Sequence, residues 1–247
     1  MNTLVKLIRP MLRISLCLAT CWALLNYIDI RISTAPQVLV DGIFYNNYDK
    51  VFSVRSPRIQ GMHGTGVLVK VKSGKSVILT NRHVCDAIGN TVLLTNGLTG
   101  GFSGVIYVDE QVDLCVIDFP ASIDIAALKV EMITLKGNEI SYSIGYPLEH
   151  DKSLTTGLVL GAVNLEVRSQ FVDQTNCSRI FMVGTTKMCG ILQSLIQTSV
   201  PTFPGSSGSP VFNKENKFIG LMNSAHPQSN FGAMIYLQDI IRVLNKF

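Results

Sequence analysis

The chain has 247 residues, enough for one large domain or two small ones at roughly 150 residues per domain. Charged residues make up 15% of it, well below the about 25% of an average soluble protein, and hydrophobic residues make up 47%, so long disorder is excluded. The net charge of +4 comes from 21 basic and 17 acidic side chains, with no Lys/Arg block beside aromatic residues. We therefore expect no nucleic-acid partner.

The N-terminus carries the pattern of a membrane-targeting segment. Three basic residues before position 14 precede an uncharged, mostly apolar run from Ile14 to Ile28. This run is shorter than the roughly 20 residues that span a bilayer, so its length does not separate a signal peptide from a signal anchor. We favour the anchor, because the best candidate cleavage site, Ser33-Thr34-Ala35, is followed by Pro36. A lipoprotein-like cleavage box at 18–21 is a weaker alternative.

The basic residues ahead of the run also predict its orientation. The positive-inside rule keeps residues 1–13 in the cytoplasm and sends the chain after the segment across the bilayer. We expect residues 1–13 to be a cytoplasmic region, 14–28 a signal anchor or signal peptide, and 29–50 a linker. The remainder is expected to be extracytoplasmic, periplasmic or extracellular, and either membrane-anchored or secreted if the segment is cleaved.

The rest of the chain has the pattern of an all-β protein. Short runs rich in Val, Ile and Thr are separated by Gly, Asn, Ser or Pro, which is typical of a sandwich or barrel. Residues 65–72 and 75–80 predict a hairpin with its turn at Ser73-Gly74. Residues 237–244 carry apolar side chains at i, i+3, i+4 and i+7 and predict a C-terminal amphipathic helix. Further strands are predicted at 91–95, 104–107, 114–119, 139–144, 157–163, 191–198, 210–212, 218–222 and 233–236.

The most specific segment for chemistry is PGSSGSPVF, from Pro204 to Phe212. Ser207 lies there between two glycines and just before a predicted strand, so a tight turn exposes its hydroxyl. The same turn leaves the backbone N–H groups of Gly205 and Ser207 free to stabilise the oxyanion that forms when an acyl carbonyl is attacked. A serine hydroxyl is unreactive without a base, so a histidine and an orienting carboxylate are needed.

Two segments supply candidates for those groups. His83 stands in LTNRHVCDA, directly after an apolar strand and in a predicted one-turn helix. Asp113 stands in VDLCVIDF as a carboxylate that opens an apolar strand, a costly position unless it has a partner. Each residue also has an ordinary structural explanation, as a loop serine, a capping histidine or a strand-edge aspartate. Together, in the order His83, Asp113 and Ser207, they predict a catalytic triad.

These motifs resemble those of the chymotrypsin-like serine proteases, and more closely the protease domain of bacterial Deg-type (high-temperature-requirement) enzymes. The resemblance runs from about Met62 to the C-terminus. It implies a trypsin-like serine endopeptidase that cleaves protein or peptide substrates, with His83 as general base, Asp113 as its orienting acid and Ser207 as nucleophile. The segments that carry it, in order, are HGTGVLV, ILTNRHVC, VDLCVID, YSIGYP, LTTG, LQSLIQTSVPTFPGSSGSPVF, KFIGLMNSA and FGAMIYLQDI.

The resemblance also implies the architecture. Chymotrypsin-like enzymes have two perpendicular six-stranded β-barrels with the triad in the cleft between them. The N-terminal barrel would span residues 51–128, and the C-terminal barrel with its helix residues 129–247. Ser206 stands where trypsin-like digestive enzymes carry the aspartate that pairs with a newly cut N-terminus, so activation by such a cut is not expected. Ser209 replaces a usual glycine, and without a peptide-binding PDZ module substrate capture is expected to rely on the cleft.

The resemblance places the specificity pocket at Pro201, six residues before the nucleophile. Neither Pro201 nor the following Thr202 carries a charge, and the opposite wall would be Asn223, Ser224 and Ala225. We expect a small uncharged pocket that accepts Ala, Val or Thr and excludes Lys and Arg, because burying an unpaired cation is costly. An alternative takes Thr202 as half of the Thr and His pair that selects Gln or Glu in viral relatives, although no histidine stands at the expected partner position.

The six cysteines fall into three pairs. Cys85 and Cys115 each follow a triad residue by two positions, so their side chains are expected to meet, either as a disulfide or as two small buried apolar groups. Cys177 and Cys189 would close a short loop, and we favour that bridge, worth about 3 kcal/mol in the chain-entropy description. The remaining pair lies in the membrane segment.

Two alternative functions come from other classes. An α/β-hydrolase esterase needs a Gly-x-Ser-x-Gly motif, which Ser209 breaks, and a later aspartate, which is missing between Ser207 and His226. A catalytically inactive protease-fold module that binds or chaperones proteins at the membrane would keep the motifs. His63, His150 and His226 are interpreted as solvated or hydrogen-bonded side chains. Because none of these histidines has metal-ligand spacing with cysteine or carboxylate residues, neither a metal nor another cofactor is expected.

Overall fold

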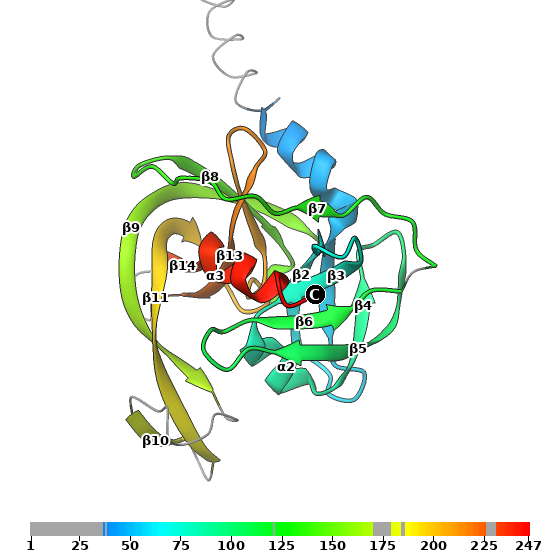
Figure 1. Cartoon of the computed structure of the whole chain (residues 1–247), viewed down its shortest axis with the longest axis vertical. Helices are drawn as coiled ribbons and strands as arrows, with labels where there is room; N and C mark the ends of the chain where they lie inside the picture. Colours follow the sequence, from blue (N-terminus) through cyan, green and yellow to red (C-terminus); the bar gives the residue numbers. More distant parts are fainter. Residues whose placement is uncertain (1–36, 38, 121, 170–178, 184–185, 226–230) are drawn as a thin grey trace, which may run out of the picture. The chain divides into compact units, whose positions relative to one another are not determined.

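The computed structural model describes residue 37 and residues 39–247, except 121, 170–178, 184–185 and 226–230 (Figure 1). The chain divides into two compact units, Met1–Gly42 and Ile43–Phe247. Residues 39–42 of the first unit are helical, and the second unit begins with helical residues 43–47 and the 3₁₀ helix η1 (Tyr48–Lys50), where a linker was expected. The predicted membrane segment lies outside the described residues. Within them, no helix is both long and apolar enough to cross a bilayer.

The first half of the second unit is a six-stranded barrel with one added strand. The sheet order is β1-β4-β5-β6-β3-β2-β7, and pairing of β1 with β2 closes the first six strands into a ring. The seventh strand, β7, pairs in parallel with β2 outside the ring. The strands are β1 (Val51–Arg55), β2 (His63–Lys70), β3 (Ser76–Thr80), β4 (Thr91–Thr95), β5 (Gly100–Val108), β6 (Cys115–Asp118) and β7 (Leu128–Lys129), with helix α2 (Arg82–Ile88) between β3 and β4.

The second half repeats this plan. Its sheet order is β10-β11-β14-β13-β12-β8-β9, and pairing of β11 with β9 closes six strands while β10 forms a hairpin on β11. In Figure 1 the long β9–β11 ribbon extends from the barrel and carries β10 at its far end. The elements are β8 (Ile140–Gly145), the 3₁₀ helix η2 (Pro147–Glu149), β9 (Ser153–Ser169), β10 (Arg179–Val183), β11 (Thr186–Pro201), β12 (Pro210–Asn213), β13 (Phe218–Ala225), β14 (Phe231–Tyr236) and α3 (Leu237–Leu244).

Each barrel buries its own apolar cluster, because alternate side chains of every strand face the interior. In the first barrel Phe52 packs edge-on against Phe119, at 5.6 Å between ring centroids. A Cβ at Gly66 of β2 would lie 2.6 Å from Ile78 Cγ2 of β3, so only glycine allows these two strands to pack this closely. The second cluster contains Val159, Ile196, Val200, Val211, Ile219, Met222 and Met234.

Helix α3 joins the second barrel to the first. Three of its four predicted apolar positions, Leu237, Ile240 and Leu244, are buried, whereas Ile241 is only partly covered and Val243 is buried instead. Arg242 donates from both terminal nitrogens to the buried carboxylate of Asp109, at 3.1 and 3.0 Å. Burial alone would raise the pKa of Asp109, but the hydrogen bonds from Arg242 and Tyr107 and from two backbone N–H groups hold it well below its usual range. This charged contact fixes the C-terminal helix against the first barrel.

The all-β double barrel with a C-terminal helix is confirmed, and every predicted strand overlaps an observed one. Three strands were not predicted. β1 has Ser53 buried in its centre and lacks clear alternation, while β7 has only two residues. The third, β10, lies between Cys177 and Cys189, where a short loop was expected. β9 and β11 are longer than predicted, because they stay paired beyond the barrel. Their ladder begins at Thr198 and Val159 and continues to Cys189 and Ser169.

Candidate active site

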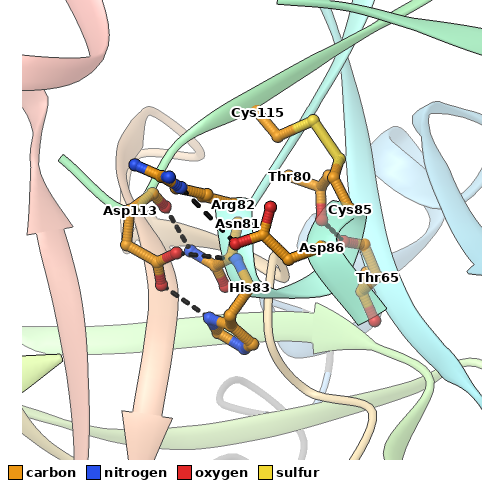
Figure 2. Close-up of a disulfide and its surroundings, with 9 residues drawn as sticks. All are labelled: Thr65, Thr80, Asn81, Arg82, His83, Cys85, Asp86, Asp113 and Cys115. Carbon is orange, nitrogen blue, oxygen red and sulfur yellow. Dashed lines mark hydrogen bonds and ion pairs between the residues drawn. A yellow bond between two sulfur atoms is a disulfide. The ribbon is translucent and has the colours of Figure 1, made fainter. Parts of the chain in front are cut away.

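The first part of the candidate site is the pair of His83 and Asp113. His83 lies in the first turn of α2, directly after β3, and Asp113 lies just before β6. His83 Nδ1 is 2.6 Å from Asp113 Oδ2, and the backbone N–H of His83 donates to Asp113 Oδ1 at 2.8 Å (Figure 2). Both carboxylate oxygens are thus bound by one residue, which fixes the imidazole ring with its other nitrogen, Nε2, turned away from the acid.

Further polar partners hold the buried Asp113. The side-chain amide of Asn223, from β13, donates to Asp113 Oδ2 at 2.8 Å. The backbone N–H of Asp113 donates to Gln193 Oε1 of β11 at 3.2 Å, and Asn81 Nδ2 donates to the Asp113 carbonyl at 3.2 Å. An unpaired buried carboxylate would be strongly unfavourable, and the bonds from His83 and Asn223 offset that penalty, whereas Gln193 and Asn81 hold the backbone of Asp113. Two of the three come from the second barrel, so both barrels position the acid.

The electrostatics of His83 follow from this pairing. Burial alone lowers the pKa of the imidazole, but the charge of Asp113, its hydrogen bond to Nδ1 and the more distant charge of Asp86 outweigh burial. The net result is a pKa of His83 raised above its ordinary value of 6.5. A stronger base accepts a proton more readily from a hydroxyl.

A disulfide lies behind the histidine and the acid. Cys85 of α2 is bonded to Cys115 of β6, with the Cα atoms 6.5 Å apart (Figure 2). Of the two alternatives left open for this pair, the structure has the bridge. It ties the helix that carries His83 to the strand that follows Asp113. The favoured bridge between Cys177 and Cys189 is untested, because Cys177 lies outside the described residues.

The second part of the site is the turn that carries Ser207. The Ser207 carbonyl accepts a hydrogen bond from the Thr65 N–H at 2.8 Å, and the Gly208 N–H donates to the Met222 carbonyl at 2.8 Å. The Ser207 hydroxyl donates to the backbone carbonyl of Asn223 at 3.1 Å. Asn223 therefore contacts both Ser207 and Asp113. Among the described residues, no hydrogen bond joins the Ser207 hydroxyl to the His83 ring.

The turn at 203–206 directs the two backbone N–H groups expected to bind an oxyanion. The Ser206 N–H donates to the Phe203 carbonyl at 2.9 Å, and Gly205 has φ +91°, the pattern of a type II turn with Pro204 second. The Pro204 carbonyl accepts from Leu148 N–H at 2.7 Å, and the Ser206 carbonyl accepts from Ser209 N–H at 3.0 Å.

In a trans peptide the N–H points opposite to the carbonyl. With the Pro204 and Ser206 carbonyls held in this way, the N–H groups of Gly205 and Ser207 point away from those partners. Neither of them has an acceptor in the described part of the chain.

The two serines that depart from the resembled motif have structural explanations. The Ser206 hydroxyl accepts the Phe203 N–H at 3.3 Å, so this side chain stabilises the turn itself. A Cβ at Gly145 would lie 2.0 Å from Ser209 Oγ, so Ser209 fits because position 145 is glycine.

Residues 64–221 match the family model of the trypsin-like peptidase domain, which is more than half of the chain. The chain belongs to this family. Among curated proteins it is similar to the Serine protease Do-like HtrA of Bacillus subtilis, 29% identical over 64% of this chain and 32% of that protein. The HtrA of Lactobacillus helveticus is 25% identical over 82% of this chain and 45% of that protein. The chain thus spans less than half the length of these relatives.

Solved structures agree on the fold of this trypsin-like peptidase. The Rv3671c protease of M. tuberculosis in its active form has a TM-score of 0.69 at 18% identity, over 85% of this chain and 86% of that one. A tripeptide-bound HtrA-type protease variant has a TM-score of 0.61 at 17% identity, over 84% of this chain and 62% of that one. The resemblance to chymotrypsin-like and Deg-type proteases is therefore confirmed for family and fold.

The residues predicted to form the specificity pocket of this trypsin-like peptidase differ in exposure and in the direction of their side chains. Pro201 is exposed at the end of β11, while Thr202 is buried and donates to the Val200 carbonyl at 3.2 Å. A Cβ at Gly232 would lie 2.4 Å from Thr202 Oγ1, so the space beside Thr202 is narrow. Asn223 was predicted as a pocket wall, but its side chain is turned to Asp113.

The other two predicted wall residues, Ser224 and Ala225, lie in β13 opposite Ala233 and Gly232 of β14. Their role as a pocket wall stays a prediction. The pocket's selectivity stays a prediction.

Two site residues were missed from the sequence. Thr65 donates its hydroxyl to the Gly205 carbonyl at 2.7 Å and accepts the Tyr146 N–H at 3.1 Å, so it links β2, the residue after β8 and the turn. His63 was interpreted as a solvated or hydrogen-bonded histidine, and its side chain is hydrogen-bonded and only 8% exposed. Both stand in the HGTG segment that was quoted for the resemblance, and their place in that motif was the available signal that they belong to the site.

Proposed function

We propose that this trypsin-like peptidase is an active serine endopeptidase with His83 as general base, Asp113 as its orienting acid and Ser207 as nucleophile. The observation that carries the proposal is the His83–Asp113 pair, in which both carboxylate oxygens bind one histidine whose pKa is raised. The unpaired N–H groups of Gly205 and Ser207 would stabilise the oxyanion, each worth roughly 3–4 kcal/mol in the transition state.

In the proposed reaction the Ser207 hydroxyl leaves the Asn223 carbonyl and attacks the carbonyl carbon of the scissile peptide. Its proton passes to His83 Nε2 as the Oγ–C bond forms, and the negative charge develops on the former carbonyl oxygen. Collapse of this intermediate breaks the C–N bond, and the leaving amine takes the proton from His83. A water molecule then repeats the sequence and releases the acid product and free Ser207.

The test is the full-length Ser207→Ala variant. We expect kcat on a peptide substrate to fall by roughly 10⁴- to 10⁶-fold with an unchanged circular dichroism spectrum. A fluorophosphonate probe should label the wild-type protein and leave the variant unlabelled. Labelling of neither protein, with turnover absent from both, would instead favour the inactive binding or chaperone module.

The proposed substrates are proteins or peptides with a small uncharged side chain before the cleaved bond. This specificity is supported by the narrow space beside Thr202 and by the absence of charge at Pro201 and Thr202. An unpaired Lys or Arg would be excluded by the cost of desolvating its charge. Cleavage of a peptide library mainly after Lys or Arg would contradict this assignment of the pocket.

The proposed location is extracytoplasmic, at the membrane or released from it. The support is the basic residues ahead of the apolar run Ile14–Ile28, together with the Cys85–Cys115 disulfide, which is typical of oxidising compartments. Tags at both termini, probed with an added protease on intact cells, test the orientation. A C-terminal tag protected inside the cells would contradict it.

A further inference from the structure

The imidazole of His63 lies directly against the glycine that supplies one of the proposed oxyanion N–H groups. A Cβ at Gly205 would be 2.2 Å from His63 Nε2 and 2.8 Å from His63 Cδ2. The ring therefore fills the space that a side chain at position 205 would occupy. His63 comes from the start of β2, in the other barrel, and its side chain is only 8% exposed.

The hydrogen bonds of His63 define one state of the ring. The Glu149 N–H donates to His63 Nε2 at 3.1 Å, so Nε2 carries no hydrogen. The other nitrogen, Nδ1, lies 3.1 Å from the Gly61 carbonyl and 3.6 Å from the Glu149 carboxylate, and it carries the hydrogen that Gly61 accepts. The neutral ring protonated at Nδ1 satisfies both bonds, whereas a hydrogen on Nε2 would meet the Glu149 N–H.

The segment that His63 binds is held in an unfavourable conformation. Leu148 has φ 53° and Glu149 has φ 62°, two consecutive residues with side chains in the left-handed region. Such residues persist only where surrounding contacts hold them, and they gather at functional sites. The Leu148 N–H donates to the Pro204 carbonyl, which is the carbonyl of the peptide whose N–H belongs to Gly205. His63 thus touches Gly205 directly and also holds the segment that orients the same peptide.

We propose that His63 is a positioning residue for the oxyanion-binding N–H of Gly205. By accepting the Glu149 N–H it keeps Leu148 in place, and Leu148 keeps the Pro204 carbonyl turned away from the reacting carbonyl. Loss of the acceptor lets the 147–149 segment relax and the 204–205 peptide rotate, which withdraws the N–H from the transition state. This role depends on the proposed serine endopeptidase activity, and it concerns kcat rather than substrate binding.

The experiment compares three substitutions in the full-length protein. His63→Phe keeps a ring of similar size without an acceptor, and His63→Gln restores an acceptor near the position of Nε2. His150→Phe is the matched control, because His150 is an exposed histidine of the neighbouring segment. The readouts are kcat and KM on a peptide p-nitroanilide, the inhibition constant of a peptide boronic acid, which forms a tetrahedral adduct, and the melting temperature.

We expect His63→Phe to lower kcat about 10²-fold with KM within about threefold, since one oxyanion donor is worth that much or more. Boronate inhibition should weaken with kcat. His63→Gln should recover kcat to within about tenfold of wild type, and His150→Phe should match wild type. If His63→Phe does not fold, His63→Asn, whose shorter amide ends before the Glu149 N–H, is expected to show the same loss of kcat.

Several results would overturn the assignment. The assignment fails if His63→Phe or His63→Asn keeps wild-type kcat, or if either variant changes only KM. It also fails if His63→Gln is as impaired as His63→Phe. In each of these cases the endopeptidase proposal still stands. A wild-type protein without turnover, unlabelled by a fluorophosphonate, would overturn the endopeptidase proposal and this role together.

Discussion

The two sides of the candidate site are held by different means. His83 and Asp113 lie 30 residues apart in the first barrel and are joined by two hydrogen bonds, while the Cys85–Cys115 disulfide joins their segments just behind them. The turn that carries Ser207 belongs to the second barrel and is held by hydrogen bonds to partners far away in the sequence, such as Thr65, 140 residues before Gly205. The bonds between His83 and Asp113 thus lie within one barrel, with Asn223 and Gln193 of the second barrel adding support to the acid, whereas the oxyanion-binding turn depends mainly on contacts between the two barrels. Substitutions on each side should fail in different ways.

The largest effect in this comparison is expected from Asp113→Asn on the base side. The amide keeps the shape but favours the wrong tautomer of His83, so kcat should fall about 10⁴-fold. Rate also falls as pH drops through the pKa of His83, because the base must be neutral. Since the charge of Asp113 raises that pKa, the variant should lose activity only at a lower pH than wild type. Profiles of kcat/KM between pH 5 and 9 measure both effects, and coincident acidic limbs would contradict the pairing.

The next effect is expected from Gly205→Ala on the turn side. The new Cβ would lie 2.2 Å from His63 Nε2 and 2.4 Å from the Tyr146 carbonyl, at a φ of +91° that disfavours any residue with a side chain. The turn must shift, so kcat should fall about 10²- to 10³-fold through loss of an oxyanion donor. The acidic limb of the pH profile should stay where wild type has it, because the base is untouched. A shifted limb would show that the two sides are not separable.

A smaller effect is expected from Asn223→Ala, because Asn223 contacts both sides. Its amide donates to Asp113 and its backbone carbonyl accepts the Ser207 hydroxyl. The substitution removes only the first contact, a hydrogen bond to a charged group worth about 1.5–3 kcal/mol. The two bonds from His83 still hold the Asp113 carboxylate, so only part of its support is lost. We expect kcat to fall about tenfold with KM within about threefold. A loss as large as that of Asp113→Asn would assign Asn223 a greater part in holding the acid.

This contrast also explains what the sequence predicted. His83 and Asp113 stand in short motifs beside apolar strands, and those motifs lead directly to the observed pair. The short runs rich in Val, Ile and Thr likewise predicted most strands, but not β1, where the polar Ser53 interrupts the apolar residues. His63 and Thr65 could not be assigned to the turn from spacing, because their partners lie in the other barrel. The side chain of Asn223 was misplaced for the same reason, since its partner Asp113 is 110 residues away.

The smallest effect on activity is expected from removing the Cys85–Cys115 disulfide. The double variant Cys85→Ala and Cys115→Ala removes two buried sulfur atoms, while both hydrogen bonds from His83 to Asp113 remain. A cross-link across a separation of 30 residues restricts the unfolded chain by about 3–4 kcal/mol in the chain-entropy description, so the melting temperature should fall by roughly 10 °C.

At 25 °C, where the variant is still folded, kcat should stay within about threefold of wild type, because the acid still orients the imidazole. Wild-type protein treated with a thiol reductant is the control, and it should behave like the variant if the bond is accessible. Calorimetry and turnover measured on the same samples separate stability from geometry. A loss of kcat near that of Asp113→Asn, without unfolding, would mean that the disulfide positions the base and that the carboxylate alone is insufficient.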